Sequence, residues 1–154
     1  MKREFPHNPI VAVGGVILKN EKVLLVKRQN PPDKSMWSIP GGAVELGETL
    51  SEAVQREINE ECGIKVDNGQ IIAVIDKIYS AKSGILYHYE IVDFEFKDFI
   101  GTPYPGSDAL DIRFFTFNEA LNCKTVATSV KELIEKIYIH SIAKKSPLYL
   151  TYRI

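Results

Sequence analysis

The chain has 154 residues, 45% hydrophobic and 25% charged, and this size and composition predict a single compact domain, residues 1–154, with an apolar core. The formal net charge of −1 argues against the basic surface that stable binding to nucleic acid or to an anionic membrane requires. Cys62 and Cys123 are too far apart in sequence to indicate a disulfide framework or a thiolate metal site. With no signal-like or membrane-spanning apolar run, we expect a cytoplasmic protein.

Strand-like segments open the chain. The runs 10–18 and 22–27 are rich in β-branched and aliphatic residues and are separated by three polar residues, so they predict a hairpin. A polar loop that contains proline then leads to a short strand beginning at Trp37. The Gly41–Gly42 pair predicts that this strand ends in a sharp turn.

The clearest helix prediction covers residues 49–62. This segment contains no glycine or proline, and its apolar side chains recur at helical spacing. Thr49 and Glu52 have the spacing of a capping box, and Gly63 stands where a helix C-cap glycine belongs. We therefore expect one well-bounded central helix.

The second half of the chain predicts more strands and one further helix. Strand-like runs cover 71–79, 86–96 and 112–117, and a helical pattern covers 129–142. Strands thus lie on both sides of the central helix, and a second helix closes the chain. This order of elements predicts an α+β layer architecture.

The segment 42–64 is strongly acidic, with six glutamates against one basic residue, Arg56. At 100° per residue, Glu57 and Glu61 fall among the apolar positions of the helix and Glu60 borders them, so three carboxylates converge on the side that faces the protein. Because desolvated like charges are costly, we expect a cation there. Oxygen ligands favour Mg²⁺ or Mn²⁺ over zinc. By composition alone, a solvated acidic helix face is the commoner meaning of such a charge run.

The spacing within this segment is more specific than its composition. It resembles the signature of the Nudix hydrolase family, G-x5-E-x7-R-E-U-x-E-E-x-G-U, in which U is a bulky aliphatic residue. The chain meets every fixed position, through Gly42, Glu48, Arg56, Glu57, Ile58, Glu60, Glu61, Gly63 and Ile64. The resemblance implies the α/β/α sandwich of that family, with a mixed central β-sheet and with the signature on a loop, helix and loop.

The resemblance also implies a role for each carboxylate of the signature. Glu57, Glu60 and Glu61 are expected to bind Mg²⁺ or Mn²⁺. The cation is expected to polarise a diphosphate oxygen and to lower the pKa of a water that attacks phosphorus. Glu57 or Glu61 could also act as the catalytic base.

The remaining conserved positions of the family signature are expected to support this site. By resemblance, Glu48 lies in the loop and pairs with Arg56 to brace the helix, which makes both part of the catalytic apparatus. Gly42 and Gly63 are expected to permit the turns at the two ends of the signature.

Residues outside the signature could complete the site. Many members of the family add an acidic residue as base or as a further ligand, and this chain offers Glu90, Asp93, Glu95, Asp108 and Asp111. We favour Asp108, because a loop before a strand can approach the metal face, although an aspartate that caps a turn is equally typical. Lys27 and Arg28 end a predicted strand and are the candidates for contacts with substrate phosphates.

The stretch 87–115 resembles small members of the family that act on ADP-ribose. The favoured function is therefore hydrolysis of the diphosphate linkage in an ADP-ribose-like nucleoside diphosphate derivative. A pyrophosphohydrolase that removes oxidised nucleoside triphosphates and a non-catalytic nucleotide-binding module are the alternatives. An isopentenyl-diphosphate isomerase is disfavoured, because such proteins carry a degraded signature. Family members often dimerise, so the resemblance also allows a homodimer.

Overall fold

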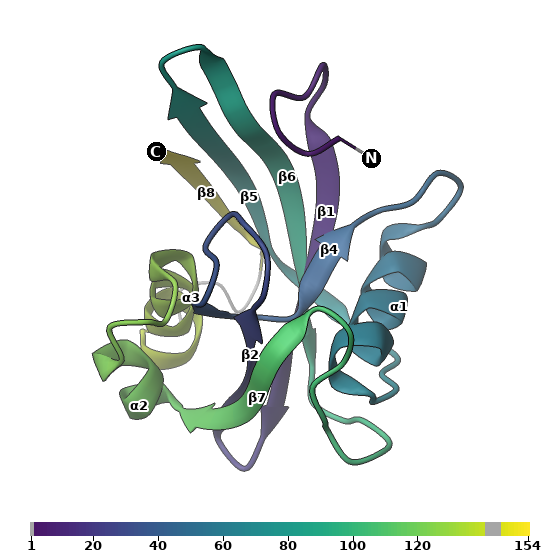
Figure 1. The fold of residues 1–154 in the computed structure, drawn as a ribbon. Helices are drawn as coiled ribbons and strands as arrows, with labels where there is room; N and C mark the ends of the chain where they lie inside the picture. Colours follow the sequence, from purple (N-terminus) through teal and green to yellow (C-terminus); the bar gives the residue numbers. More distant parts are fainter. Residues whose placement is uncertain (1, 141–145) are drawn as a thin grey trace.

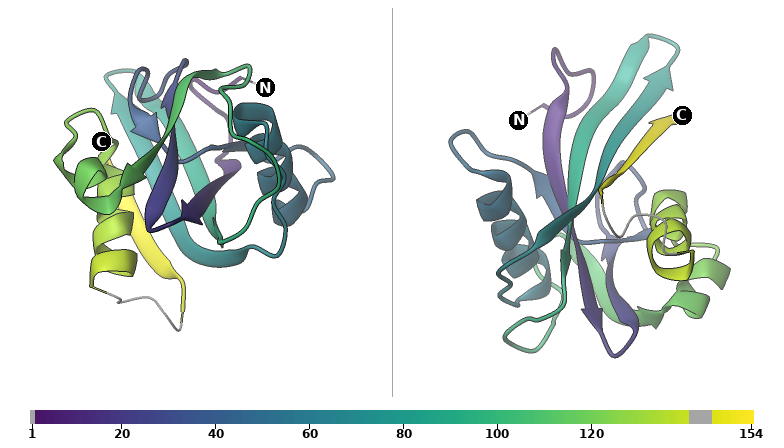
Figure 2. Two further views of the ribbon diagram at one scale, coloured as in Figure 1. Left: turned by 90° about the horizontal axis from the view of Figure 1, so that it is seen from below. Right: turned by 180° about the vertical axis from the view of Figure 1, so that it is seen from behind.

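The structure is a computed structural model that describes residues 2–140 and 146–154. Helix α1 covers one face of a central β-sheet, and the helices of the C-terminal third cover the other (Figures 1 and 2). The elements in chain order are β1 (Ile10–Lys19), β2 (Lys22–Arg28), β3 (Trp37–Ser38), β4 (Gly41–Ala43), α1 (Leu50–Cys62), β5 (Gln70–Ala81), β6 (Gly84–Phe96), β7 (Ala109–Thr116), α2 (Phe117–Asn122), α3 (Thr128–Leu133), the π-helical segment η1 (Ile134–Ile139) and β8 (Leu148–Arg153). The predicted α+β sandwich is confirmed.

The central sheet is mixed, as the family resemblance implied. Its strand order is β3-β2-β1-β6-β5-β8, with β4 paired to β1 and β7 paired to β2. β1 runs parallel to β6, β8 runs parallel to β5, and the other pairs are antiparallel. The strands of both halves of the chain therefore interleave in one layer.

The four central residues of strand β2, Val23 to Val26, are all hydrophobic because both faces of the strand are covered there. Val23 and Leu25 join the core beneath α2, α3 and η1, whereas Leu24 and Val26 join the core beneath α1. Side chains alternate between the two faces of a strand, so a strand between two layers needs apolar residues at every position. The sheet thus separates two hydrophobic cores.

Helix α1 begins and ends where the sequence predicts. The Thr49 side chain accepts a hydrogen bond from the Glu52 N–H, and the Glu52 carboxylate accepts one from the Thr49 N–H, which completes the capping box. Gly63 ends the helix with a φ of 67°, a left-handed conformation that favours glycine. Ala53, Val54, Ile58 and Cys62 form its buried face.

Two sequence predictions for the C-terminal third of the chain were wrong. The single helix over 129–142 is two segments, α3 and η1, which end at Ile139; Ser141 and Ile142 lie outside the described residues. The chain closes on strand β8, whose Leu150 enters the core beside β5, and not on a helix. Helix α2 escaped prediction because it begins immediately after β7, within one strand-like run. Tertiary pairing decided these assignments.

The Gly41–Gly42 pair was also predicted wrongly, because it lies in strand β4 and not in a turn. Gly41 pairs with Gly14 and Gly42 with Val13 of β1. Within residues 2–140 and 146–154, no helix is long and apolar enough to cross a membrane.

Candidate active site

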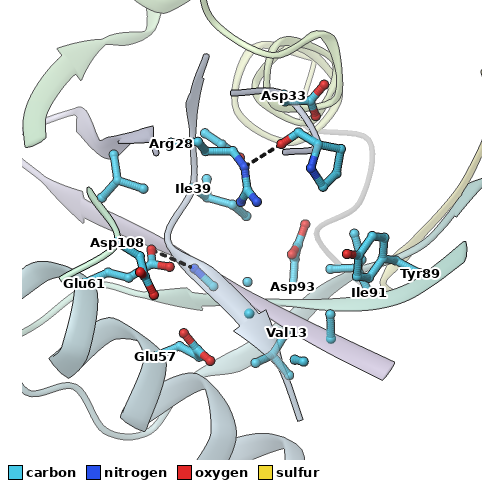
Figure 3. A pocket seen from close by; sticks show the side chains of 18 of the residues that line it. Val13, Arg28, Asp33, Ile39, Glu57, Glu61, Tyr89, Ile91, Asp93 and Asp108 are labelled. Carbon is cyan, nitrogen blue, oxygen red and sulfur yellow. Dashed lines mark hydrogen bonds between the residues drawn. The ribbon is translucent and has the colours of Figure 1, made fainter. Parts of the chain in front are cut away.

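A pocket of about 330 Å³ opens where β1 changes its pairing partner. β1 pairs with β4 around Val13 but with β2 only at Leu18 and Lys19, so strands from both parts of the sheet line the pocket. Residues of α1 line one side, and residues of β5, β6 and α3 line the deeper part (Figure 3). The acidic signature and a buried hollow in the sheet therefore belong to one cavity.

Arg56 connects three carboxylates of the signature. Its Nε and Nη2 donate to the two oxygens of Glu48 at 2.5 and 2.9 Å, and its Nη1 donates to Glu57 at 2.8 Å and to Glu60 at 3.3 Å. The Arg56 hydrogen bonds are the main cause that lowers the pKa of Glu48 to about 2. The pairing of Glu48 with Arg56 that the resemblance implied is therefore present, and it ties the loop before α1 to the helix.

Glu57 and Glu61 line the pocket from one face of α1 (Figure 3). Burial raises the pKa of Glu57 against the opposing effect of Arg56. Burial, followed by the charge of Glu57, raises the pKa of Glu61 to about 8. The Gly41 N–H donates to Glu61 Oε2 at 3.3 Å. Two carboxylates with raised pKa values thus stand at one wall, where a positive charge lowers their free energy.

Glu60 differs from these two residues. Its side chain is 51% exposed, compared with 14% for Glu57, so Glu60 lines the pocket at its rim, beside the two more buried carboxylates. Among the described residues, no three acidic, histidine or cysteine side chains are gathered into a ligand set. Glu57 and Glu60 instead both accept hydrogen bonds from the Nη1 of Arg56.

The two glycines of the signature are required for different physical reasons. Gly63 permits the turn that ends α1, as predicted. Gly42 lies in a strand, so the prediction that it permits a turn was wrong. A Cβ on Gly42 would stand 2.4 Å from Glu57 Oε1, so this position is glycine because the carboxylate approaches the backbone there.

The candidates outside the signature divide into two groups. Arg28 and Asp108 both line the pocket (Figure 3), and Asp108 lies in the exposed turn before β7. The Arg28 Nε donates to the Pro32 carbonyl at 2.9 Å. Lys27 is not among the described residues that line the pocket. In the sheet it pairs with Trp37 of β3 on one side and with Asp111 of β7 on the other. Arg28 is thus the basic residue of the pair that stands at the pocket.

Sequence reasoning named Asp93 as one of five acidic candidates but did not select it. The structure places Asp93 in the deep part of the pocket, on the same face of β6 as Tyr89 and Ile91 (Figure 3). Burial raises its pKa to about 7, although Lys77 opposes this effect. The available signal was an aspartate at the inward-facing position of an apolar strand, two residues after Ile91.

Known proteins are similar to this chain in sequence and in fold. A family model for the NUDIX domain matches residues 8–137. The ADP-ribose pyrophosphatase of Methanocaldococcus jannaschii is 37% identical over 115 residues, which are 72% of this chain and 64% of that protein. The CTP pyrophosphohydrolase of Escherichia coli is 31% identical over 86 residues, 55% of this chain and 64% of that protein. This chain thus spans about 64% of the length of these curated relatives.

Among solved structures, the MutT NUDIX hydrolase of Burkholderia pseudomallei is similar, with a TM-score of 0.76 and 26% identity. The similarity covers 85% of this chain and 99% of that protein. The fold of this chain is thus found in a solved NUDIX hydrolase. Because the domain model extends over most of its length, the chain belongs to the NUDIX domain family.

Proposed function

We propose that this protein is a metal-dependent hydrolase that cleaves the diphosphate linkage of a nucleoside diphosphate derivative, with an ADP-ribose-like molecule as the favoured substrate. The observation that carries the proposal is the pair of Glu57 and Glu61, which stand on one pocket wall with raised pKa values, opposite Arg28. Two such carboxylates favour a bound cation. The cation and the Arg28 guanidinium would together bind a polyphosphate.

The residues proposed to hold the metal are Glu57, Glu60 and Glu61. Nudix hydrolases generally use a divalent metal ion. The donors fit such an ion, because two half-buried carboxylates with raised pKa values favour a nearby cation, and because oxygen ligands suit Mg²⁺ or Mn²⁺. The bound ion would act as a Lewis acid on the diphosphate and lower the pKa of a bound water.

The protein's own side chains have separate tasks in this proposal. Arg28 binds a phosphate group of the substrate, and Asp108 contributes a further carboxylate at the mouth of the pocket. Glu57 or Glu61 accepts the proton of the attacking water. Arg56 holds the Glu57 carboxylate in place through a 2.8 Å hydrogen bond. Glu48 in turn holds Arg56 through two hydrogen bonds.

The choice of substrate is supported by one relative and limited by another. The M. jannaschii relative is named an ADP-ribose pyrophosphatase, which favours a diphosphate that joins a nucleoside to a second group. The E. coli relative is named a CTP pyrophosphohydrolase, which favours a nucleoside triphosphate as substrate. The alternative enzyme, a pyrophosphohydrolase that removes oxidised nucleoside triphosphates, acts on the same class of molecule. A non-catalytic nucleotide-binding module is the remaining alternative. The two free cysteines fit a reducing compartment, and we place the protein in the cytoplasm.

The test is release of nucleoside monophosphate from ADP-ribose, NADH, diadenosine polyphosphates and nucleoside triphosphates, with Mg²⁺, with Mn²⁺ and with chelator. The expected result is turnover of ADP-ribose that requires the cation and is lost in Glu61→Gln. The matched control is Glu119→Gln, an exposed glutamate on α2 outside the pocket. Turnover of triphosphates alone supports the alternative enzyme, and nucleotide binding without turnover supports the binding module.

A further inference from the structure

Asp93 is the only buried polar or charged side chain among the described residues. It is 2% exposed, and its Oδ1 has no hydrogen-bond partner within the described part of the chain. A carboxyl group in this state is costly, because it has lost its bonds to water and gained none from the protein. The side chain points into the pocket (Figure 3), and because Oδ1 is enclosed against Gly14, Oδ2 is the oxygen that a ligand in the pocket can meet.

The carboxyl group of Asp93 packs closely against the backbone of the strand opposite. Gly14 of β1 pairs with Asp93 in the parallel ladder, and a Cβ on Gly14 would lie 2.3 Å from Asp93 Oδ1. The nearest basic residue on the neighbouring strand is Lys77, whose Nζ is bound to Asp33 at 2.9 Å. The only charge that could pair with Asp93 from β5 is therefore held by another carboxylate.

Apolar side chains surround this carboxyl group. Ile39 from the segment between β3 and β4, Ile91 from β6 and Leu133 from α3 line the same part of the pocket. An apolar slot with one polar group at its floor is typical of sites that hold a flat ring and read its edge. A phosphate does not suit this part of the pocket, because it would meet an acidic group with no free cation beside it.

We propose that Asp93 selects the nucleobase of the substrate by accepting a hydrogen bond from an exocyclic amino group. The inference rests on the proposed function, which places the phosphates at Arg28 and the signature carboxylates. The base then extends into the slot between Ile39 and Ile91. An amino group satisfies the ionised carboxylate, whereas a carbonyl oxygen at the same ring position places two acceptors face to face. The class of substrate is therefore an adenine, cytosine or guanine nucleotide.

The experiment measures binding of nucleoside monophosphates, which contain no diphosphate linkage to cleave. Calorimetric titration compares three pairs that differ in an amino group, namely AMP with IMP, CMP with UMP, and GMP with IMP. For at least one pair, the wild-type protein is expected to bind the amino-bearing nucleotide about tenfold more tightly, which corresponds to about 1.4 kcal/mol. Equal affinity within all three pairs, or no binding of any, overturns the proposal.

Two substitutions identify Asp93 as the cause. Asp93→Leu has no acceptor and is expected to abolish the difference within the pair, whereas Asp93→Asn keeps an acceptor oxygen and retains part of it. Asp93→Asn, which keeps the shape of the side chain, is expected to melt at a higher temperature than the wild type, and a cooperative melt of both variants shows that lost selectivity is not lost folding. Asp98→Asn, in the exposed loop after β6, is the matched control. Unchanged selectivity in Asp93→Leu overturns the proposal.

The same titrations separate this proposal from the proposed hydrolase activity. Glu61→Gln is expected to lose turnover while it keeps the preference for the amino-bearing base, because Glu61 lies on α1 and Asp93 on β6. A protein that shows the preference but hydrolyses nothing refutes the hydrolase proposal and leaves the role of Asp93 in place. A protein that hydrolyses its substrate but shows no preference refutes the role of Asp93 and leaves the hydrolase proposal in place.

Discussion

Arg56 and Glu48 are joined by two parallel hydrogen bonds, 2.5 and 2.9 Å long, across the loop that precedes α1. The same guanidinium holds the Glu57 carboxylate at 2.8 Å. A planar group that donates in a fixed fork can serve both partners at once, whereas an ammonium group cannot. Arg56 thus holds Glu57, one of the proposed metal ligands, in place.

Arg56→Lys is expected to lower kcat/KM by about tenfold or more, because a point charge cannot hold Glu48 and Glu57 together. Arg113→Lys, an exposed arginine of β7, is the matched control. Steady-state kinetics on the best substrate measure the effect. Full activity in Arg56→Lys would show that the guanidinium fork does not orient the site.

Glu61→Gln is expected to lower kcat by about a hundredfold or more, because the variant loses a carboxylate proposed as metal ligand or base. Mn²⁺ should raise the Tm of the wild type more than the Tm of the variant, since a ligand stabilises the state that binds it. The thermal shift reports cation binding without turnover. An equal shift in both proteins would remove Glu61 from the metal site.

Alanine at the two signature glycines is expected to give opposite phenotypes. In Gly42→Ala the new Cβ meets the flexible end of Glu57, so the carboxylate moves and activity falls, while the free energy of unfolding changes by less than about 0.5 kcal/mol. In Gly63→Ala the left-handed φ of 67° costs about 1 kcal/mol of stability. Urea denaturation and initial rates on both variants measure this. An unfolded Gly42→Ala protein would contradict the assignment.

The stability of the metal-free protein is expected to fall as the pH rises from about 4 to about 7. Burial raises the pKa of Asp93 from its usual 3.8 to about 7. In this window the unfolded chain has lost the proton and the folded chain keeps it, so the folded state binds more protons and each increase in pH favours unfolding. The stabilising contribution is complete below the usual value and lost above the raised one.

Asp93→Asn removes this titration. The variant is expected to show a flatter dependence of the free energy of unfolding on pH between about 4 and 7 than the wild type, and to be more stable at pH 7. Urea denaturation at half-unit steps of pH measures both curves. Because Lys77 opposes the rise in the pKa of Asp93, the fall in stability in Lys77→Met should extend to higher pH than in the wild type. Identical slopes in wild type and Asp93→Asn would rule out Asp93 as the titrating group.

The sequence by itself determined the elements whose signals are local. The capping residues Thr49 and Glu52, the glycine that ends α1 and the apolar periodicity between them all act within one helix, so they specify it without the rest of the chain. Helical geometry likewise placed Glu57 and Glu61 on one face, and the family resemblance implied the pairing of Glu48 with Arg56.

Only the tertiary structure decided which charges became buried and which partner each one found. Asp93 and Gly14 are remote in sequence and meet only because β6 runs parallel to β1. The Leu148–Arg153 strand exists because β5 offers an edge for it, and Gly42 is required by a carboxylate that approaches from α1. Desolvation and strand pairing depend on long-range neighbours, and a sequence read locally contains neither.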